Sequence, residues 1–238
     1  VEAGQSWVVK LALKLAHRFN RNTREGSQVN IAAHYDLGNE FFQLFLDPTM
    51  MYSSALFPDH ITSLEAASET KLDELCRQLE LSPDDHLLEI GTGWGGMAIH
   101  AAKHYGCRVT TTTISREQYT YACARVREEG LEHRITLLCE DYRNLTGHYD
   151  KLVSIEMIEA VGHEFYQHYF QTCAGLLKHD GKMVIQAITV ADQRYKAARD
   201  SVDFIQRYIF PGGCLPSVAV MADHIAMDTD MQIVHLRD

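Results

Sequence analysis

The chain has 238 residues, 46% of them hydrophobic, which is ample for one sizeable core. A formal net charge of -10 at pH 7 argues against nucleic acid as a general partner. The six cysteines are scattered without a Cys-x-x-Cys pair, so we expect no metal site and no disulfide framework, which is typical of a reducing cytoplasm. No apolar run is long enough to span a bilayer, no signal peptide is visible, and Val1 in place of an initiator methionine predicts a cut N-terminus.

Residues 3–20 have the pattern of an amphipathic helix, with apolar residues on one face and a basic stripe on another. The apolar positions are Trp7, Leu11, Leu15 and Phe19, and the basic positions are Lys10, Lys14, Arg18 and Arg21. In an acidic protein such a stripe can hold a helix against anionic lipid. More often it is the solvated face of a helix that packs on its own domain.

The segment 34–54 is rich in aromatic residues and hydroxyls without a clean period, and it includes Tyr35, Tyr52 and Ser53. Rings combined with hydroxyls suit a pocket lid that buries an apolar ligand and still offers a few hydrogen bonds. The alternative is an irregular cluster that only caps the core. Residues 62–81 then return to helical spacing and end in a polar turn.

An apolar run over residues 87–90 meets a glycine cluster, which predicts a buried strand, a tight turn and a helix start. Gly91 and Gly93 let the backbone approach a ligand closely, and the helix N-terminus beyond them offers free N–H groups. The turn therefore predicts a nucleotide or nucleoside site, unless it merely needs glycine for its backbone angles. Glu89, at the strand end, favours a ligand with a ribose hydroxyl or an ammonium group, as in S-adenosylmethionine (SAM), because a carboxylate repels phosphate.

The end of the next strand indicates whether the site binds SAM or a dinucleotide. A dinucleotide site needs an acid at the end of that strand, about 20 residues after the glycines. The strand ends in Thr113 and Ile114 and carries no acid, so a NAD-dependent enzyme is not expected. Ser115 and Gln118 follow as the N-cap and third position of a helix, a capping box, unless Gln118 instead faces the cofactor.

The rest of the chain alternates between strands and helices. Strands are expected at 108–114, 135–139, 151–155, 183–188 and 231–236, helices at 116–130 and 164–177, and a turn at 179–181. This alternation predicts an α/β fold with a doubly wound, mostly parallel sheet. Acids follow two of the strands: Asp141, placed to accept the adenine amino group, and the pair Glu156 and Glu159, at the strand end where open α/β sheets bind their ligands.

Seven motifs follow one another in a fixed order from about residue 30 to the end. They read His-Tyr-Asp-Leu-Gly-Asn, Met-Tyr-Ser-Ser, Leu-Leu-Glu-Ile-Gly-Thr-Gly-Trp-Gly-Gly, Thr-Ile-Ser-x-x-Gln, Glu-Asp-Tyr-Arg, Val-Ser-Ile-Glu-Met-x-Glu and Tyr-Ile-Phe-Pro-Gly-Gly. With them the chain resembles the cyclopropane-fatty-acid synthase family, which includes the mycolic acid cyclopropane synthases and has the SAM-dependent methyltransferase fold.

The resemblance implies that SAM gives its methyl group to a cis double bond in an acyl chain of a membrane phospholipid. A carbocation forms, bound bicarbonate removes a proton, and a cyclopropane closes. The implied SAM contacts are Tyr35, Tyr52, Ser53, Gly91, Gly93, Thr113, Ile114 and Gln118, with Asp141 and Tyr142 at the adenine end. Glu159 is implied to hold bicarbonate beside a backbone contact at Ile155, unless it is only a helix-start acid favoured by the helix dipole.

Three positions depart from the family pattern. The bicarbonate-binding cysteine falls at Ser54, the histidine falls at Gln186, and the usual Phe-Glu-His reads Ile158-Glu159-Ala160. Serine and glutamine still hydrogen-bond an oxyanion, so we expect weakened bicarbonate binding and cyclopropane as the main product. The alternatives are a SAM-dependent C-methyltransferase that gives methyl-branched acyl chains and a non-catalytic SAM- or lipid-binding relative.

The sequence predicts two parts: an N-terminal helical and lid segment over residues 1–70, and a SAM-binding core over residues 71–238. Because the chain stops where residues 231–236 begin a strand, we expect the last strands of the fold to be missing. The resemblance implies a cytoplasmic enzyme that contacts the inner face of the membrane peripherally. The oligomeric state is not encoded in any pattern that we recognise.

Overall fold

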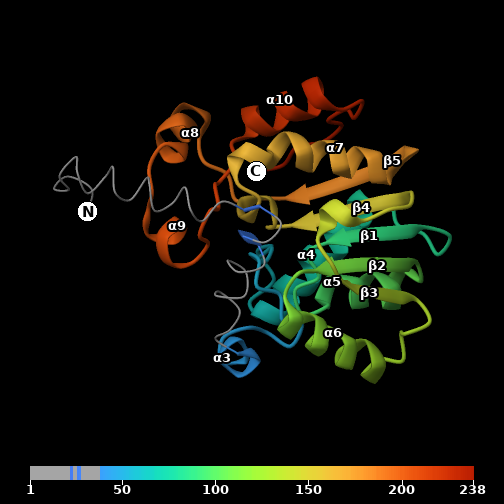
Figure 1. Ribbon diagram of the computed structural model, residues 1–238. Helices are drawn as coiled ribbons and strands as arrows, with labels where there is room; N and C mark the ends of the chain where they lie inside the picture. The colour runs from blue at the N-terminus through green and yellow to red at the C-terminus, as the bar shows by residue number, and fades with distance from the viewer. Residues whose placement is uncertain (1–21, 24–25, 28–37) are drawn as a thin grey trace. The chain divides into compact units, whose positions relative to one another are not determined.

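The computed structural model describes residues 22–23, 26–27 and 38–238 of the chain (Figure 1). The helix expected over 3–20, and Tyr35, lie outside the described residues. The chain divides into two compact units. We call the first the sheet unit, to which the described residues 38–156 and 175–186 belong, and the second the helical unit, to which residues 22–23, 26–27, 157–174 and 187–238 belong.

The sheet unit is built on five parallel strands in the order β3-β2-β1-β4-β5 (Figure 1). Their bounds are β1 His86–Ile90, β2 Arg108–Thr113, β3 Ile135–Cys139, β4 Tyr149–Ile155 and β5 Leu177–Gln186. The chain runs from β1 outward to β3 and then returns to the other side of β1 for β4 and β5. This reversal of strand order defines a doubly wound sheet, so the predicted fold class is confirmed.

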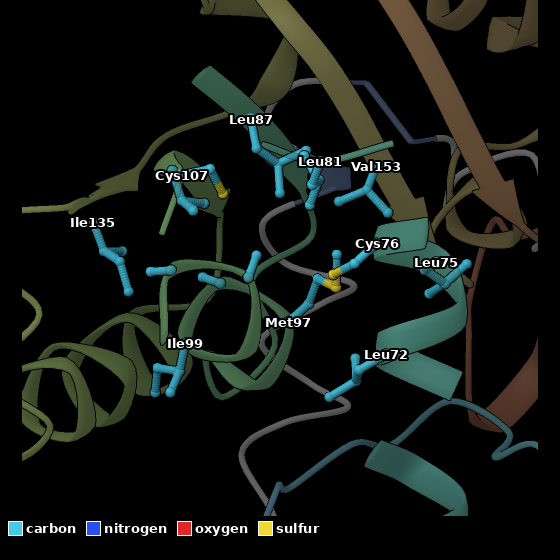
Figure 2. Packing of buried hydrophobic residues seen from close by; sticks show 14 of the residues in the cluster. Leu72, Leu75, Cys76, Leu81, Leu87, Met97, Ile99, Cys107, Ile135 and Val153 are labelled. Carbon is cyan, nitrogen blue, oxygen red and sulfur yellow. The ribbon is translucent and has the colours of Figure 1, made fainter. Parts of the chain in front are cut away.

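Most helices of the sheet unit bury apolar side chains in one core against the strands. The helices are α3 Asn39–Gln43, α4 Leu64–Gln78, α5 Gly96–His100, the π-helical turn η2 Ala101–Tyr105, α6 Arg116–Glu128 and the short 3-10 turn η3 Tyr142–Asn144. Figure 2 shows Leu72 and Cys76 of α4, Met97 of α5 and Leu87 of β1 in the same cluster. All four residues are at most 1% exposed, so this core fixes α4 and α5 against β1. Phe42 of α3 instead belongs to a separate cluster with Met50 and Trp94.

Serine side chains begin two of these helices, and the sequence pattern indicates one of the two, Ser115. The Ser63 hydroxyl accepts a hydrogen bond from the Ala66 N–H at 3.2 Å and starts α4. The Ser115 hydroxyl accepts one from the Gln118 N–H at 3.3 Å and starts α6. Each cap satisfies an N–H group that has no partner within its own helix.

The helical unit contains α8 Asp192–Arg199, α9 Phe204–Tyr208, α10 Val218–Asp228, most of α7 Tyr166–Leu176, and the 3-10 turns η4 Ile158–Ala160 and η5 His163–Phe165. Helices α7 and α10 pack together through rings and polar ends. Phe170 stacks on His224 with ring centroids 6.2 Å apart, and the Gln167 amide donates to Asp228 at 2.9 Å.

Three sequence expectations differ from the structure. Residues 231–236, expected to form a strand, form neither helix nor strand, because alternating residues make a strand only where a neighbour pairs with them. The strand expected at 183–188 begins earlier, at Leu177. The turn expected at 179–181 lies within β5, where the pairing with β4 is irregular. Tyr149 of β4 pairs with Leu177 of β5, but Lys151 of β4 pairs with Lys182, so several residues of β5 are passed over.

The boundary expected at residue 70 remains a prediction. The two compact units divide the chain differently, because the described residues 38–70 belong to the same unit as the strands. Within the described part of the chain, no helix combines the length and apolar character needed to cross a bilayer.

Candidate cofactor site

The glycine turn at the end of β1 has the open backbone that a ligand requires. Gly91, Gly93 and Gly95 all have positive φ angles, of 102°, 52° and 89°. The N–H groups of Gly91 and Thr92 both donate to the Thr112 carbonyl at 3.0 Å, which pins the turn to β2. A Cβ added at Gly93 would meet nothing within 4 Å, so this side of the turn is free to receive a ligand.

The next glycine serves packing rather than ligand access. A Cβ at Gly96 would lie 2.7 Å from the Met51 sulfur and 2.8 Å from the Thr49 carbonyl oxygen. The Arg125 guanidinium holds the same segment, donating to the Thr49 carbonyl at 2.9 Å and to the Trp94 carbonyl at 3.0 Å. The segment that carries Tyr52, Ser53 and Ser54 is therefore fastened to the start of α5.

Glu89 is buried in β1 and points toward the neighbouring strand. Its Oε2 accepts a hydrogen bond from the Thr111 hydroxyl at 2.6 Å, and that hydroxyl lies 2.6 Å from the hydroxyl of Thr92. Burial raises the pKa of Glu89 to about 8, and the Thr111 hydrogen bond opposes the rise. Glu89 thus supports the glycine turn through Thr92, and its proposed contact with the cofactor remains a prediction.

Gln118 faces inward. Its amide oxygen accepts from the Thr113 hydroxyl at 2.9 Å, and Thr113 in turn accepts from the Ser115 N–H at 3.1 Å. The capping box is therefore half formed: Ser115 caps the helix, but the side chain of Gln118 lies at the end of β2. Because Gln118 is only 4% exposed, a purely surface role is wrong, while Ile114 beside it is half-buried.

The acid expected at the adenine end is paired within the chain. Asp141 accepts from the Arg143 backbone N–H at 2.9 Å and from its Nε at 2.8 Å, and both side chains are buried. The Arg143 guanidinium also lies 5.7 Å from the centre of the Tyr142 ring. A role for Asp141 and Tyr142 in adenine binding stays a prediction, and it would have to share the carboxylate with Arg143.

Aromatic rings form a wall beside the glycine turn, as the composition of 34–54 predicts. The Phe42 ring lies 4.8 Å from Trp94 and 5.4 Å from Tyr52, measured between centroids. The Trp94 indole N–H donates to the Asn39 side-chain oxygen at 2.6 Å. Trp94 is a site residue that sequence reasoning missed, although its place inside the glycine motif was a signal for it.

A second cluster lies at the ends of β4 and β5. Ser54 donates to the Oε1 atom of Glu156 from its backbone N–H at 3.0 Å and from its hydroxyl at 2.9 Å. Gln186 donates to the same oxygen at 2.8 Å. Ile155 is the last residue of β4 and pairs with Gln186. The structure therefore brings together Ser54, Gln186 and Ile155, and it adds Glu156, which the sequence analysis had only noted.

This cluster does not suit bicarbonate. The donors that the resemblance assigns to bicarbonate, on Ser54 and Gln186, are directed at the carboxylate of Glu156. A second anion in the same place would lie against the negative charge of Glu156. Bicarbonate therefore does not fit the residues that this chain presents.

Lys71 is a buried cation that the sequence analysis did not single out. It is only 5% exposed, and its Nζ donates to the Ser53 hydroxyl at 2.6 Å. Burial lowers the pKa of Lys71 to about 8, while the carboxylates of Glu156 and Asp47 act in the opposite direction. Lys71 therefore connects Ser53, the neighbour of Ser54, with the nearby carboxylates of Glu156 and Asp47.

Glu159 belongs to the helical unit. Its Oε1 accepts from the Ile188 N–H at 2.5 Å, and its backbone carbonyl accepts from the Cys214 N–H at 2.8 Å. A Cβ at Gly213 would lie 2.8 Å from that carbonyl oxygen, which explains a glycine in the motif at 208–213. The loop of Glu159 is thus held by backbone contacts, and the role of its carboxylate stays a prediction.

The model of the mycolic acid cyclopropane synthetase family matches residues 22–238. The chain belongs to this family. The resemblance given by the seven motifs is confirmed, and with it the methyltransferase type of the fold.

Two curated relatives carry the names of different activities. The chain is 42% identical to the tuberculostearic acid methyltransferase UfaA1 of Mycobacterium tuberculosis over 90% of its length and 51% of the relative. It is 39% identical to the cyclopropane-fatty-acyl-phospholipid synthase of Escherichia coli K12, over 87% of its length and 52% of the relative. The chain therefore spans about half the length of the curated relatives that it matches.

Solved structures of family members have the same fold. The crystal structure of the mycolic acid cyclopropane synthase CmaA1, complexed with S-adenosylhomocysteine (SAH) and CTAB, superimposes with a TM-score of 0.81 at 31% identity. The match covers 87% of this chain and 76% of CmaA1.

We predict that Gly93→Val abolishes SAM binding, measured by calorimetry, because its side chain fills the open side of the turn. Gly130→Val is the matched control, since Gly130 has a φ of 67° and also has nothing within 4 Å of its Cβ position. Both variants carry a left-handed backbone strain of about 1–2 kcal/mol, so their stabilities should fall alike. Equal SAM affinity in the two variants would remove the site from this turn.

We also predict a pH signature of Glu89. Its pKa is about 8 in the folded state, against 4.5 as the ordinary value. Between these values the folded state keeps a proton that the unfolded state has lost, so the free energy of unfolding falls as pH rises from about 5 to about 8. Glu89→Gln should remove that decline, measured by denaturant unfolding at both pH values. The exposed Glu128→Gln is the control, and parallel pH curves for wild type and Glu89→Gln would contradict the assignment.

Proposed function

We propose that this chain is the SAM-dependent core of an enzyme that transfers a methyl group to the cis double bond of an unsaturated acyl chain in a phospholipid and closes a cyclopropane. The observation that carries the proposal is the open glycine turn at Gly93, flanked by the inward-facing Gln118 and by the aromatic wall. Family membership supports the methyl donor and the lipid substrate.

When bound, SAM supplies an electrophilic methyl group. The residues of the chain then have two tasks. Gly91, Gly93 and Gln118 hold the cofactor at the ends of β1 and β2. The rings of Phe42, Tyr52 and Trp94 exclude water and present π faces, which stabilise a sulfonium or a carbocation.

Contact with a membrane surface is supported by apolar side chains near the aromatic wall. Phe41, Leu44 and Phe45 lie in or directly after α3 and are 45%, 82% and 48% exposed. Exposed apolar residues that lie together mark interaction sites for lipid or protein. We infer that this surface meets the membrane that carries the acyl substrate, on the cytoplasmic side.

A second candidate product is a methyl-branched acyl chain. The relative with 42% identity carries the name of a methyltransferase rather than a cyclopropane synthase. The engagement of Ser54 and Gln186 by Glu156 also favours this candidate, because bicarbonate does not fit there.

The test supplies the protein with methyl-labelled SAM and vesicles of dioleoyl phosphatidylglycerol. The labelled lipids are then analysed by mass spectrometry and NMR. Cyclopropane ring protons in the product support the cyclopropane synthase. A methyl branch or a methylidene group in the product supports the second candidate instead. Absence of label in any lipid overturns both and leaves a non-catalytic SAM- or lipid-binding relative.

We predict that Glu159→Gln leaves SAM affinity within error of wild type and lowers product formation about 100-fold or more, as the loss of one preorganised catalytic group does. Glutamine keeps an oxygen for the Ile188 N–H, so the loop should hold its shape. Calorimetry and label incorporation measure the two effects, with the exposed Glu164→Gln as control. Turnover close to that of the control would show that Glu159 is only a helix-start acid.

A further inference from the structure

Glu156 lies at the point of the sheet where a ligand is expected. The register pairs Ile90 of β1 with Ser154 of β4. Glu156, directly after β4, therefore lies at the same height in the sheet as the glycine turn that follows β1. The strand order reverses between these two strands, with β2 and β3 on one side and β5 on the other. Open α/β sheets bind their ligands in the crevice at such a point, outside the carboxyl ends of the strands.

The backbone of Glu156 is strained. Its φ angle is 46°, a left-handed conformation that costs a non-glycine residue about 1–3 kcal/mol. The Glu156 N–H donates to the Gln186 carbonyl at 2.8 Å, which fixes this conformation at the end of the sheet. Strain of this kind persists where the position of a side chain matters, and here it aims a carboxylate back toward Ser54.

One oxygen of this carboxylate is anchored and the other is available. The Ser54 N–H, the Ser54 hydroxyl and the Gln186 amide all end on Oε1. Oε2 accepts no hydrogen bond from the residues that the structure describes. All three of these groups are hydrogen-bond donors. The arrangement therefore fits an ionised carboxylate that is held in one orientation and keeps Oε2 as a free acceptor.

A buried cation compensates the charge of this acid. Lys71 interacts electrostatically with Glu156 and holds Ser53, the residue next to Ser54, at 2.6 Å. The cluster is therefore a connected network of acid, amide, hydroxyls and ammonium rather than a lone surface acid. Such a network orients its members more firmly than separate pairs do.

We propose that Glu156 is the proton acceptor of this chain, a built-in base in the place where the resemblance predicts bicarbonate. The inference rests on the proposed function. After methyl transfer has broken the S–C bond and left a cation on the neighbouring acyl carbon, Oε2 of Glu156 takes a proton from the transferred methyl group. The C–H electron pair closes the third side of the ring, and the acid then releases its proton to water. If a hydride first shifts from the methyl-bearing carbon to the cationic carbon, the same electron pair instead forms a C=C bond and gives a methylidene branch.

The test uses two variants in the protein with labelled SAM and dioleoyl phosphatidylglycerol vesicles in bicarbonate-free buffer. Glu156→Gln keeps the size of the side chain and its anchored oxygen but removes the base. Glu156→Gly suits the positive φ angle and leaves the donors of Ser54 and Gln186 open to a small anion. Glu80→Gly is the control, because Glu80 is an exposed acid with a φ of 53° whose carboxylate pairs with Lys182, outside the cluster.

We expect wild type and Glu80→Gly to turn over at rates that added bicarbonate does not change. Glu156→Gln should lose about 100-fold or more with SAM affinity unchanged, the usual effect of removing a general base. Glu156→Gly should lose as much and regain activity with formate or bicarbonate. A bicarbonate-dependent wild type, near-normal turnover in Glu156→Gln, or loss in Glu156→Gly without anion rescue would each overturn the inference. A wild type that labels no lipid would instead overturn the proposed function.

Discussion

The parallel pairing of β1 with a strand on each side is the constraint on which the site depends. Because β2 and β4 run level with β1, the residues that follow all three strands meet at one edge of the sheet. The Thr112 carbonyl accepts the first two amides of the glycine turn and so fixes where the turn begins. The open side of Gly93, the inward side chain of Gln118 and the carboxylate of Glu156 all take their positions from this register.

Acids at this edge of the sheet accept hydrogen bonds from donors of the chain itself. Glu89 is bound by Thr111 of the next strand, Asp141 by Arg143, and Glu156 by Ser54 and Gln186. Burying a polar group without a partner is costly, so these donors are needed for the fold as well as for orientation. The chemistry available to the site is set by which of these acids keeps an oxygen free.

Much of the fold could be predicted from the sequence, because strand and helix periods and glycine turns are local signals. Bounds of β1, β2 and β3 lie within a residue of their predicted positions, whereas residues 231–236 were wrongly expected to pair. Partners of buried side chains are harder to predict. Ser54 and Gln186 lie 132 residues apart in the chain, and only the folded structure brings the segment of Ser54 to the end of β5. The role of Glu156 in joining them was missed, since a left-handed glutamate has no signature in one sequence.

The left-handed backbone at Glu156 has an evolutionary consequence. A glycine adopts a φ of 46° without strain, whereas a glutamate there is held against its own preference. Exchange of these two residues would move a negative charge into or out of the edge of the sheet while leaving the strands unaltered. In this chain, the choice between an acid carried by the protein and an anion taken from solution would thus depend on a single residue.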